Sequence, residues 1–90
     1  MYYVYIVTNY TNKVFYIGIT NNLSRRIEEH KLGLVDGFTK KYKCKKLVYF
    51  EEFSKSIDAI NREKKLKNWH RQWKINLIKS VNPDFEEITI

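Results

Sequence analysis

The sequence predicts one α+β domain spanning residues 1–90, in which a three-stranded, mainly antiparallel sheet is flanked by helices. Two observations predict this class. Three segments rich in aromatic and β-branched residues have the character of strands, and only a short polar link separates the first two. Between and after these segments, apolar residues recur at helical spacing. The predicted order is therefore strand, strand, helix, strand, helix, helix.

The first two strands are predicted at residues 2–8 (YYVYIVT) and 13–19 (KVFYIGI). The NYTN link between them is rich in turn-forming residues, so the two strands are expected to form a hairpin. A third strand is predicted at residues 45–53 (KKLVYFEEF), after a loop-like segment at residues 34–44.

The register of the hairpin decides which tyrosines meet, because alternate side chains of a strand share one face. If Thr8 pairs with Lys13, then Tyr5 lies directly opposite Tyr16, and two phenols stand side by side. Taken alone, such a pair is more typical of ordinary sheet-building tyrosines than of a functional site.

A helix of about ten residues is expected after the hairpin, because Asn21-Asn22 offers an N-cap and Gly33 a stop. Leu23 and Ile27, four residues apart, form its apolar stripe.

The second half of the chain predicts two further helices. Ser56 can cap the first of them, which ends near residues 68–70, and the helical pattern resumes until Asn82-Pro83. The apolar stripe of the first comprises Ile57, Ile60, Leu66 and Trp69. We expect Trp69 and Trp73 to pack together in the core, with base stacking as a minor alternative. Phe85 and Ile88 of the acidic tail are candidates to dock.

The charge of the chain is +7 at pH 7, and it is unevenly distributed. Twelve of the seventeen Lys and Arg residues lie between Lys40 and Lys74, a stretch that holds only four acidic residues. Such a concentrated positive field suits a polyanion, most simply nucleic acid, although a solvated basic face is an equally open interpretation.

The lone Cys44 cannot form an intrachain disulfide, so packing must hold the fold and a reducing compartment is expected. We found neither an apolar run of about 20 residues, as a membrane span requires, nor the pattern of a signal peptide. We therefore expect a cytoplasmic protein that contacts no membrane. Nucleotide-binding loops and Ser-His-Asp patterns are also absent, and no small-molecule organic cofactor is expected.

The first predicted helix places two candidate functional residues on one side, since Arg26 and His30 are four apart and flank its apolar stripe. An arginine at this edge can reach a phosphate with its planar guanidinium. A surface salt bridge is the alternative, and it fits Arg25 with Glu29 better than it fits Arg26.

Glu63 falls on or beside the apolar stripe of the second helix. Acidic side chains are rarely buried unless they are paired or bind a metal. The neighbouring Arg62, Lys64 and Lys65 could pair with this carboxylate, and from the sequence alone pairing is the simpler interpretation.

These segments resemble the motifs of a known family when they are read in order. Tyr16-Ile17-Gly18 is an intact YIG triplet, and Tyr3-Val4-Tyr5 stands where the GIY triplet would. Residues 22–30 resemble the first helix, and residues 59–63 the metal-binding helix, of the GIY-YIG endonuclease superfamily. The resemblance covers essentially the whole chain and is closest to the small single-domain YhbQ-like bacterial group. Each triplet alone is a weak signal, whereas the ordered set is a strong one.

The resemblance implies a role for each matching residue. Tyr5 and Tyr16 would lie at the catalytic centre, where one of them acts on the nucleophilic water as general base or positions it. Arg26 would hold the scissile phosphate, and His30 would assist proton handling or phosphate contact. Glu63 would hold a single Mg²⁺ or Mn²⁺ ion that neutralises the leaving oxygen. An asparagine late in the chain would also join the site, and two residues, Asn76 and Asn82, are the candidates for it.

The function implied by the resemblance is hydrolysis of phosphodiester bonds in nucleic acid, DNA in the first place, with a role in DNA repair or recombination. A chain this short suggests weak sequence specificity or recognition of a flap, branch or nick. Two alternatives stay open: a non-catalytic nucleic-acid-binding module, and a protein-interaction domain. Six residues of the basic stretch are candidate contacts to nucleic acid: Lys40, Lys41, Lys43, Arg62, Lys64 and Lys67.

Overall fold

The computed structural model describes residues 1–35 and 37–90, so residue 36 of the predicted loop lies outside the described residues. The predicted α+β class with a three-stranded sheet is confirmed, and every strand pair is antiparallel. The elements in chain order are β1 (Tyr2–Thr8), β2 (Phe15–Thr20), α1 (Leu23–Lys31), α2 (Phe38–Tyr42), β3 (Lys46–Phe53), α3 (Ser56–Lys67) and α4 (Arg71–Val81).

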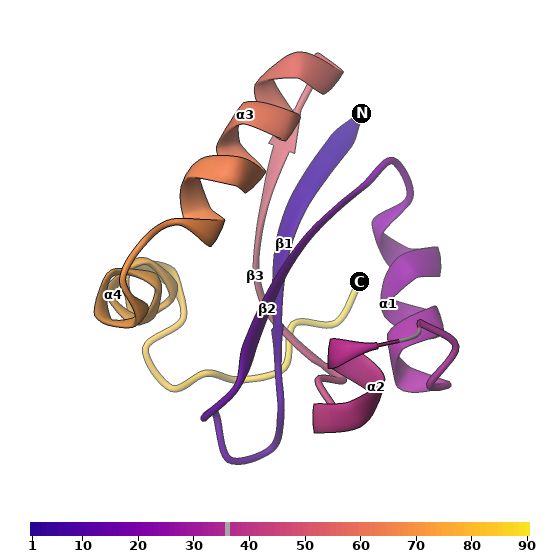
Figure 1. The fold of residues 1–90 in the computed structure, drawn as a ribbon, viewed down its shortest axis with the longest axis vertical. Coiled ribbons are helices and arrows are strands. Elements are labelled where there is room, and N and C mark those ends of the chain that lie inside the picture. Colours follow the sequence, from indigo (N-terminus) through magenta and orange to yellow (C-terminus); the bar gives the residue numbers. More distant parts are fainter. Residues whose placement is uncertain (36) are drawn as a thin grey trace.

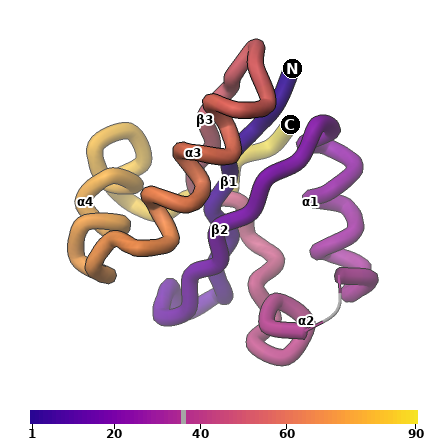
Figure 2. Tube along the Cα trace, turned by 45° about the horizontal axis from the view of Figure 1, so that its top comes forward, coloured from indigo at the N-terminus to yellow at the C-terminus, as the bar shows by residue number. Residues whose placement is uncertain are grey.

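The sheet has the order β2-β1-β3, so β1 is central and β2 forms one edge. Helices cover both of its faces. One buried cluster joins Val4, Ile6 and Val48 of the sheet to Leu66 of α3 and Ile78 of α4. The other side carries α1 and α2, as Figures 1 and 2 show by placing these two helices across the strands from α3 and α4.

The predicted hairpin forms, but its predicted register was wrong by two residues. Thr8 pairs with Phe15, and Tyr5 pairs with Gly18 rather than with Tyr16. The reason is a longer turn, in which the Asn9 side chain accepts hydrogen bonds from the amides of residues 13 and 14 at 3.0 and 3.2 Å. A shift of two residues keeps every side chain on its predicted face.

α1 begins and ends as the sequence predicts. The Asn22 side chain caps it by accepting a hydrogen bond from the backbone of Arg25 at 3.2 Å. At the other end Gly33 adopts a left-handed conformation with φ +70°, which a glycine enters without strain. Leu23 and Ile27 are buried against the sheet.

The sequence did not predict α2, a helix of five residues within the segment assigned to a loop. Thr39 and Cys44 anchor it, since both are buried and the Cys44 amide donates to the Thr39 carbonyl at 3.0 Å. The aromatic residues of α2, Phe38 and Tyr42, are 46% and 42% exposed. The helix is therefore held by small residues and presents its rings outward.

The predicted break between α3 and α4 is confirmed, but two details of α3 were wrong. Lys55, not Ser56, is the N-cap residue, so Ser56 is already helical. Ile57 and Ile60 are exposed, whereas Ala59 and Leu66 are fully buried. The helix is thus rotated so that Ala59, rather than the isoleucines, faces the sheet.

Trp69 and Trp73 pack together as predicted, with ring centroids 5.8 Å apart in an edge-to-face arrangement. The predicted place in the core holds only in part, because Trp69 packs against the core cluster whereas Trp73 is 54% exposed.

The tail after α4 docks through both predicted residues. Phe85 is buried in the same cluster as Val48, and the Ile88 amide donates to the Leu47 carbonyl at 2.8 Å. In the described part of the chain, every helix is too short or too polar to cross a membrane.

Candidate active site

Tyr5 and Gly18 are paired across the hairpin in such a way that the tyrosine ring lies over the glycine. A Cβ atom added to Gly18 would overlap the ring and hydroxyl of Tyr5. The YIG triplet therefore needs a glycine at this position because the Tyr5 ring occupies the space where a side chain would lie. The requirement comes from packing and not from the backbone conformation.

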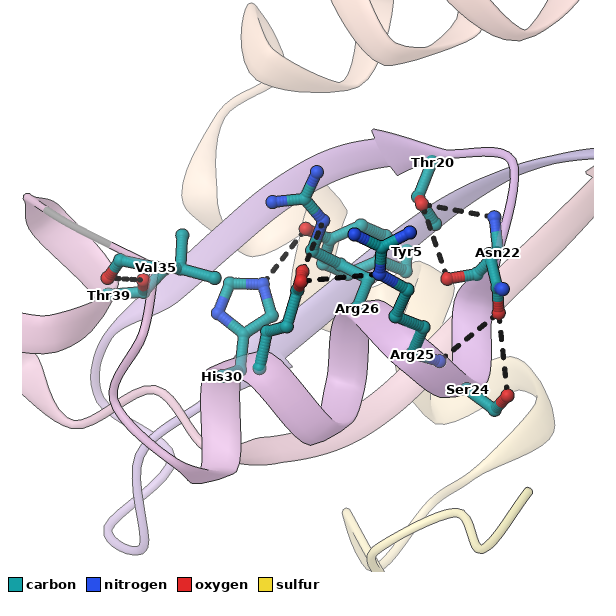
Figure 3. Close-up of polar contacts among 10 residues, drawn as sticks. Tyr5, Thr20, Asn22, Ser24, Arg25, Arg26, His30, Val35 and Thr39 are labelled. Carbon is teal, nitrogen blue, oxygen red and sulfur yellow. Dashed lines mark hydrogen bonds and ion pairs between the residues drawn. The ribbon is translucent and has the colours of Figure 1, made fainter.

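The Tyr5 hydroxyl shares a buried hydrogen bond of 2.9 Å with Nε2 of His30, and Figure 3 shows the two side chains meeting between α1 and the strands. Burial, the neighbouring Tyr16 and two nearby carboxylates raise the pKa of Tyr5 above its ordinary value, although Arg26 lowers it. Burial and Arg26 together lower the pKa of His30 to about 4. Both groups are therefore neutral at pH 7.

Tyr16 lies beside this pair but is more exposed. Its ring centroid is 6.5 Å from that of Tyr5 and 6.0 Å from that of His30. It stands diagonal to Tyr5 rather than opposite, since its partner across the hairpin is Val7. The two phenols still share one face of the sheet, with Tyr5 buried and Tyr16 partly exposed.

Arg26 borders the site from α1, and its guanidinium is 3.6 Å from Glu29. The predicted surface pair of Arg25 with Glu29 is confirmed at 3.4 Å. Arg25 is 75% exposed at its side chain, whereas Arg26 is 39% exposed. A groove of about 390 Å³ runs past both arginines, and its other lining residues are Thr20, Asn21, Asn22, Glu29, Leu34 and Val35.

Glu63 approaches from α3, and only 16% of its side chain is exposed, so its predicted inward position is confirmed. Its partner is Lys67 at 3.1 Å, not one of the three basic neighbours that the sequence suggested. The Lys67 ammonium also lies over the Tyr16 ring, 5.7 Å from its centroid. Glu63 is near enough to Tyr5 to raise the pKa of that phenol.

The candidate residues from β1, β2, α1 and α3 therefore gather at one place, around the β2 edge of the sheet. α1 and α3 lie on opposite faces of the sheet (Figure 1). At this edge, side chains from both helices approach the phenols of Tyr5 and Tyr16.

A family model described as the GIY-YIG catalytic domain matches residues 1–76 of this chain. The chain belongs to the GIY-YIG family. A UPF0213 protein of Staphylococcus haemolyticus is 39% identical over 77 residues, which are 86% of this chain and 93% of that protein. A UPF0213 protein of Clostridium perfringens is 40% identical over 80 residues, which are 89% and 85% of the two chains. The solution NMR structure of a UPF0213 protein from Bacillus halodurans aligns with a TM-score of 0.60 and 28% identity, covering 96% of this chain and 92% of that one.

GIY-YIG nucleases typically use a divalent metal, and the donor atoms of this chain suit a hard ion held by few protein ligands. Within residues 1–35 and 37–90, no three His, Cys, Asp or Glu side chains gather in a metal-binding group. Glu63 offers an inward carboxylate at the site with 16% of its side chain exposed, whereas the Glu29 carboxylate is 29% exposed and is paired with Arg25 and Arg26. Mg²⁺ fits such a site, because it keeps several waters and accepts phosphate oxygens as ligands. Lys67 forms an ion pair with the same carboxylate, and this pair would have to break for the metal to bind.

The predicted nucleic-acid contacts of this GIY-YIG domain divide into two groups. Five of them are lysines with exposed side chains on or beside α2 and α3: Lys40, Lys41, Lys43, Lys64 and Lys67. Arg62 forms the second group, because its guanidinium already makes two 2.9 Å hydrogen bonds to the Glu51 carboxylate.

Neither candidate for the late asparagine of GIY-YIG proteins meets the site. The Asn82 amide donates to the backbone carbonyls of Val48 and Glu86 at 3.0 and 2.9 Å, so it organises the tail. Asn76 accepts a hydrogen bond from Gln72 on α4.

Two ion pairs of the site were not predicted from the sequence, that of Lys67 with Glu63 and that of Glu29 with Arg26. Both could have been found from helical spacing, since Lys67 follows Glu63 by four residues and Glu29 follows Arg26 by three. The sequence identifies Gly18 only as part of the YIG triplet. Its packing role depends on the register, which the sequence left open.

Proposed function

We propose that this protein is a metal-dependent endonuclease that hydrolyses phosphodiester bonds in nucleic acid, DNA in the first place. The observation that carries the proposal is the convergence of Tyr5, Tyr16, Arg26, His30 and Glu63 around one sheet edge. Each supplies a function that phosphodiester hydrolysis needs: an anion-binding cation, groups that position water, and a carboxylate for a metal. The basic residues of α2 and α3 support a polyanionic substrate.

Arg26 is the residue best placed to bind the scissile phosphate. It is partly exposed, it borders the groove beside α1, and its planar guanidinium can bind two phosphate oxygens at once. Glu29 holds it near the site through an ion pair that a phosphate can replace. Its charge would stabilise the developing negative charge of the pentacoordinate transition state.

Tyr16 is the phenol that can act on the attacking water, because Tyr5 is buried and already hydrogen-bonded. Tyr5 keeps its proton. Its hydrogen bond to His30 holds both side chains in place beside Tyr16 and the attacking water. Glu63 would hold Mg²⁺ or Mn²⁺, which when bound supplies a positive charge beside the leaving oxygen.

A nicking assay on supercoiled and branched DNA with Mg²⁺ or Mn²⁺ tests the proposal. Wild type should nick, EDTA should stop the reaction, and Arg26→Ala should slow it about 100- to 1,000-fold. Arg25→Ala is the matched control, since Arg25 shares the Glu29 partner but is 75% exposed at its side chain. Equal losses in both arginine variants, or nicking that survives Arg26→Ala and Glu63→Ala, would sink the assignment.

A non-catalytic nucleic-acid-binding module is the second candidate function. Lys67 favours it, because its ammonium occupies the carboxylate that a metal would need. Salt-sensitive DNA binding without cleavage of any substrate, with either metal, would support this function over the first.

A further inference from the structure

The exposed face of α2 continues the aromatic surface of the candidate site. Phe38 stacks on Tyr16 with centroids 6.2 Å apart and an interplanar angle of 28°. The ring centroid of Tyr42 lies 4.8 Å from that of Phe38. The three rings form a row, here called the aromatic row, that begins at a candidate catalytic tyrosine and leads outward along α2.

Core formation does not account for this row. α2 is anchored by buried Thr39 and Cys44, while Phe38 and Tyr42 keep 46% and 42% of their surface exposed. Residues three and four apart share a helix face, so Phe38 and Tyr42 point the same way. Two large rings thus keep nearly half of their surface exposed next to the site.

Cations border the aromatic row at both ends. Lys41 lies 5.4 Å from the centroid of the Tyr42 ring, and Lys67 lies 5.7 Å from that of Tyr16. Exposed rings interleaved with lysines match what unpaired nucleotides require, because bases stack on the rings and phosphates meet the cations. A paired base inside a duplex hides its faces and could not use such a surface.

We propose that Phe38 and Tyr42 bind an unpaired nucleobase close to the phosphate that is cleaved. The inference rests on the proposed function in taking nucleic acid as the ligand, and it narrows the substrate to one with a single-stranded or frayed segment beside the cut. Lys41 contributes a phosphate contact on the same face.

The test uses oligonucleotides that carry 2-aminopurine at successive positions, because stacking on an aromatic ring quenches its fluorescence. The full chain with Glu63→Gln binds them without cutting. One position or two adjacent ones should be quenched in a single strand and in a frayed end, and none in the interior of a blunt duplex. Phe38→Leu and Tyr42→Leu should remove the quenching and weaken single-strand binding about 5- to 100-fold each. Tyr42→Phe should retain both.

Trp73→Leu is the control, because Trp73 is similarly exposed but lies on α4, across the sheet. Urea midpoints identify any variant that fails to fold, and Lys41→Ala, which leaves the rings intact, then tests the same surface through affinity. Quenching that persists in the Phe38→Leu/Tyr42→Leu double variant, or that Trp73→Leu removes instead, overturns the proposal.

The cleavage assay separates this inference from the proposed function. Quenching that maps to the aromatic row in a protein that never cuts would overturn the nuclease proposal alone. Cutting of DNA by a protein whose Phe38 and Tyr42 variants bind normally would overturn the stacking site alone.

Discussion

Gly18 and Tyr5 show how one missing side chain supports a site. The ring of Tyr5 occupies the space above Gly18, and its hydroxyl reaches His30 from there. The sequence identified both residues by their triplets. It could not identify their contact, which arises because the register places them opposite each other.

Gly18→Ala should therefore be damaging although alanine suits a strand well. The added methyl displaces the Tyr5 ring and breaks its bond to His30, at a cost of about 1–3 kcal/mol in unfolding free energy. Urea unfolding measures the loss, and nicking should fall with it. Gly33→Asn is the control, because Gly33 has open space around it and asparagine tolerates its positive φ. Wild-type stability in Gly18→Ala would refute the packing argument.

His30 makes the stability of the protein depend on pH. Its pKa is about 4 when folded and about 6.5 when unfolded, so the unfolded chain takes up the proton first as pH falls. The contribution is complete above about pH 6.5 and decreases toward pH 4, by up to about 3 kcal/mol.

His30→Gln should flatten this part of the stability curve, measured by urea unfolding between pH 7 and pH 4.5. His70→Gln, at an exposed histidine, should leave the wild-type curve unchanged. Parallel curves for wild type and His30→Gln would contradict the assignment.

At the scale of elements, the strands and the three longer helices follow from periodicity and turn chemistry, but α2 does not. Its five residues are too few for an apolar repeat, and it is held by the buried Thr39 and by Cys44, whose thiol contacts the carbonyl of Val14 far away along the chain. The hairpin register failed for a related reason. Hydrogen bonds to the Asn9 side chain extend the turn. The alternation of apolar residues cannot distinguish registers that differ by two residues, because each side chain stays on the same face.

One ion pair between β3 and α3 adds to the apolar packing of these two elements. Arg62 makes two 2.9 Å bonds to Glu51, which also accepts a hydrogen bond from Tyr49. Only 25% and 20% of the two charged side chains are exposed. Arg62, one of the predicted nucleic-acid contacts, is therefore engaged with Glu51.

Arg62→Ala should lower the unfolding free energy by about 1–3 kcal/mol, because it leaves a half-buried carboxylate without its cation. Chemical denaturation checks the value. Lys65→Ala, at an exposed position one turn along the same helix, should cost much less. DNA affinity should change little in Arg62→Ala, and a loss as large as that of a lysine variant would restore the predicted contact.

For the whole molecule, the net charge of +7 makes nucleic-acid binding depend on salt. The plot of log Kobs against log salt should be steep. Removing Lys40 and Lys41 together should reduce its slope by about 2 if both contact phosphates. A double variant at Lys13 and Lys79, two exposed lysines outside the α2 surface, should change the slope far less. Identical slopes in all three proteins would remove α2 from the binding surface.

The order β2-β1-β3 also has a consequence for how the chain folds. β1 can pair with β2 as soon as the hairpin closes, yet its other side stays bare until β3 arrives from more than 35 residues further along the chain. During that interval the unpaired backbone groups of β1, with Val4 and Ile6 beside them, form an open edge that another chain could join. Capture of β3 should therefore be the slow step of folding, and the period of greatest aggregation risk.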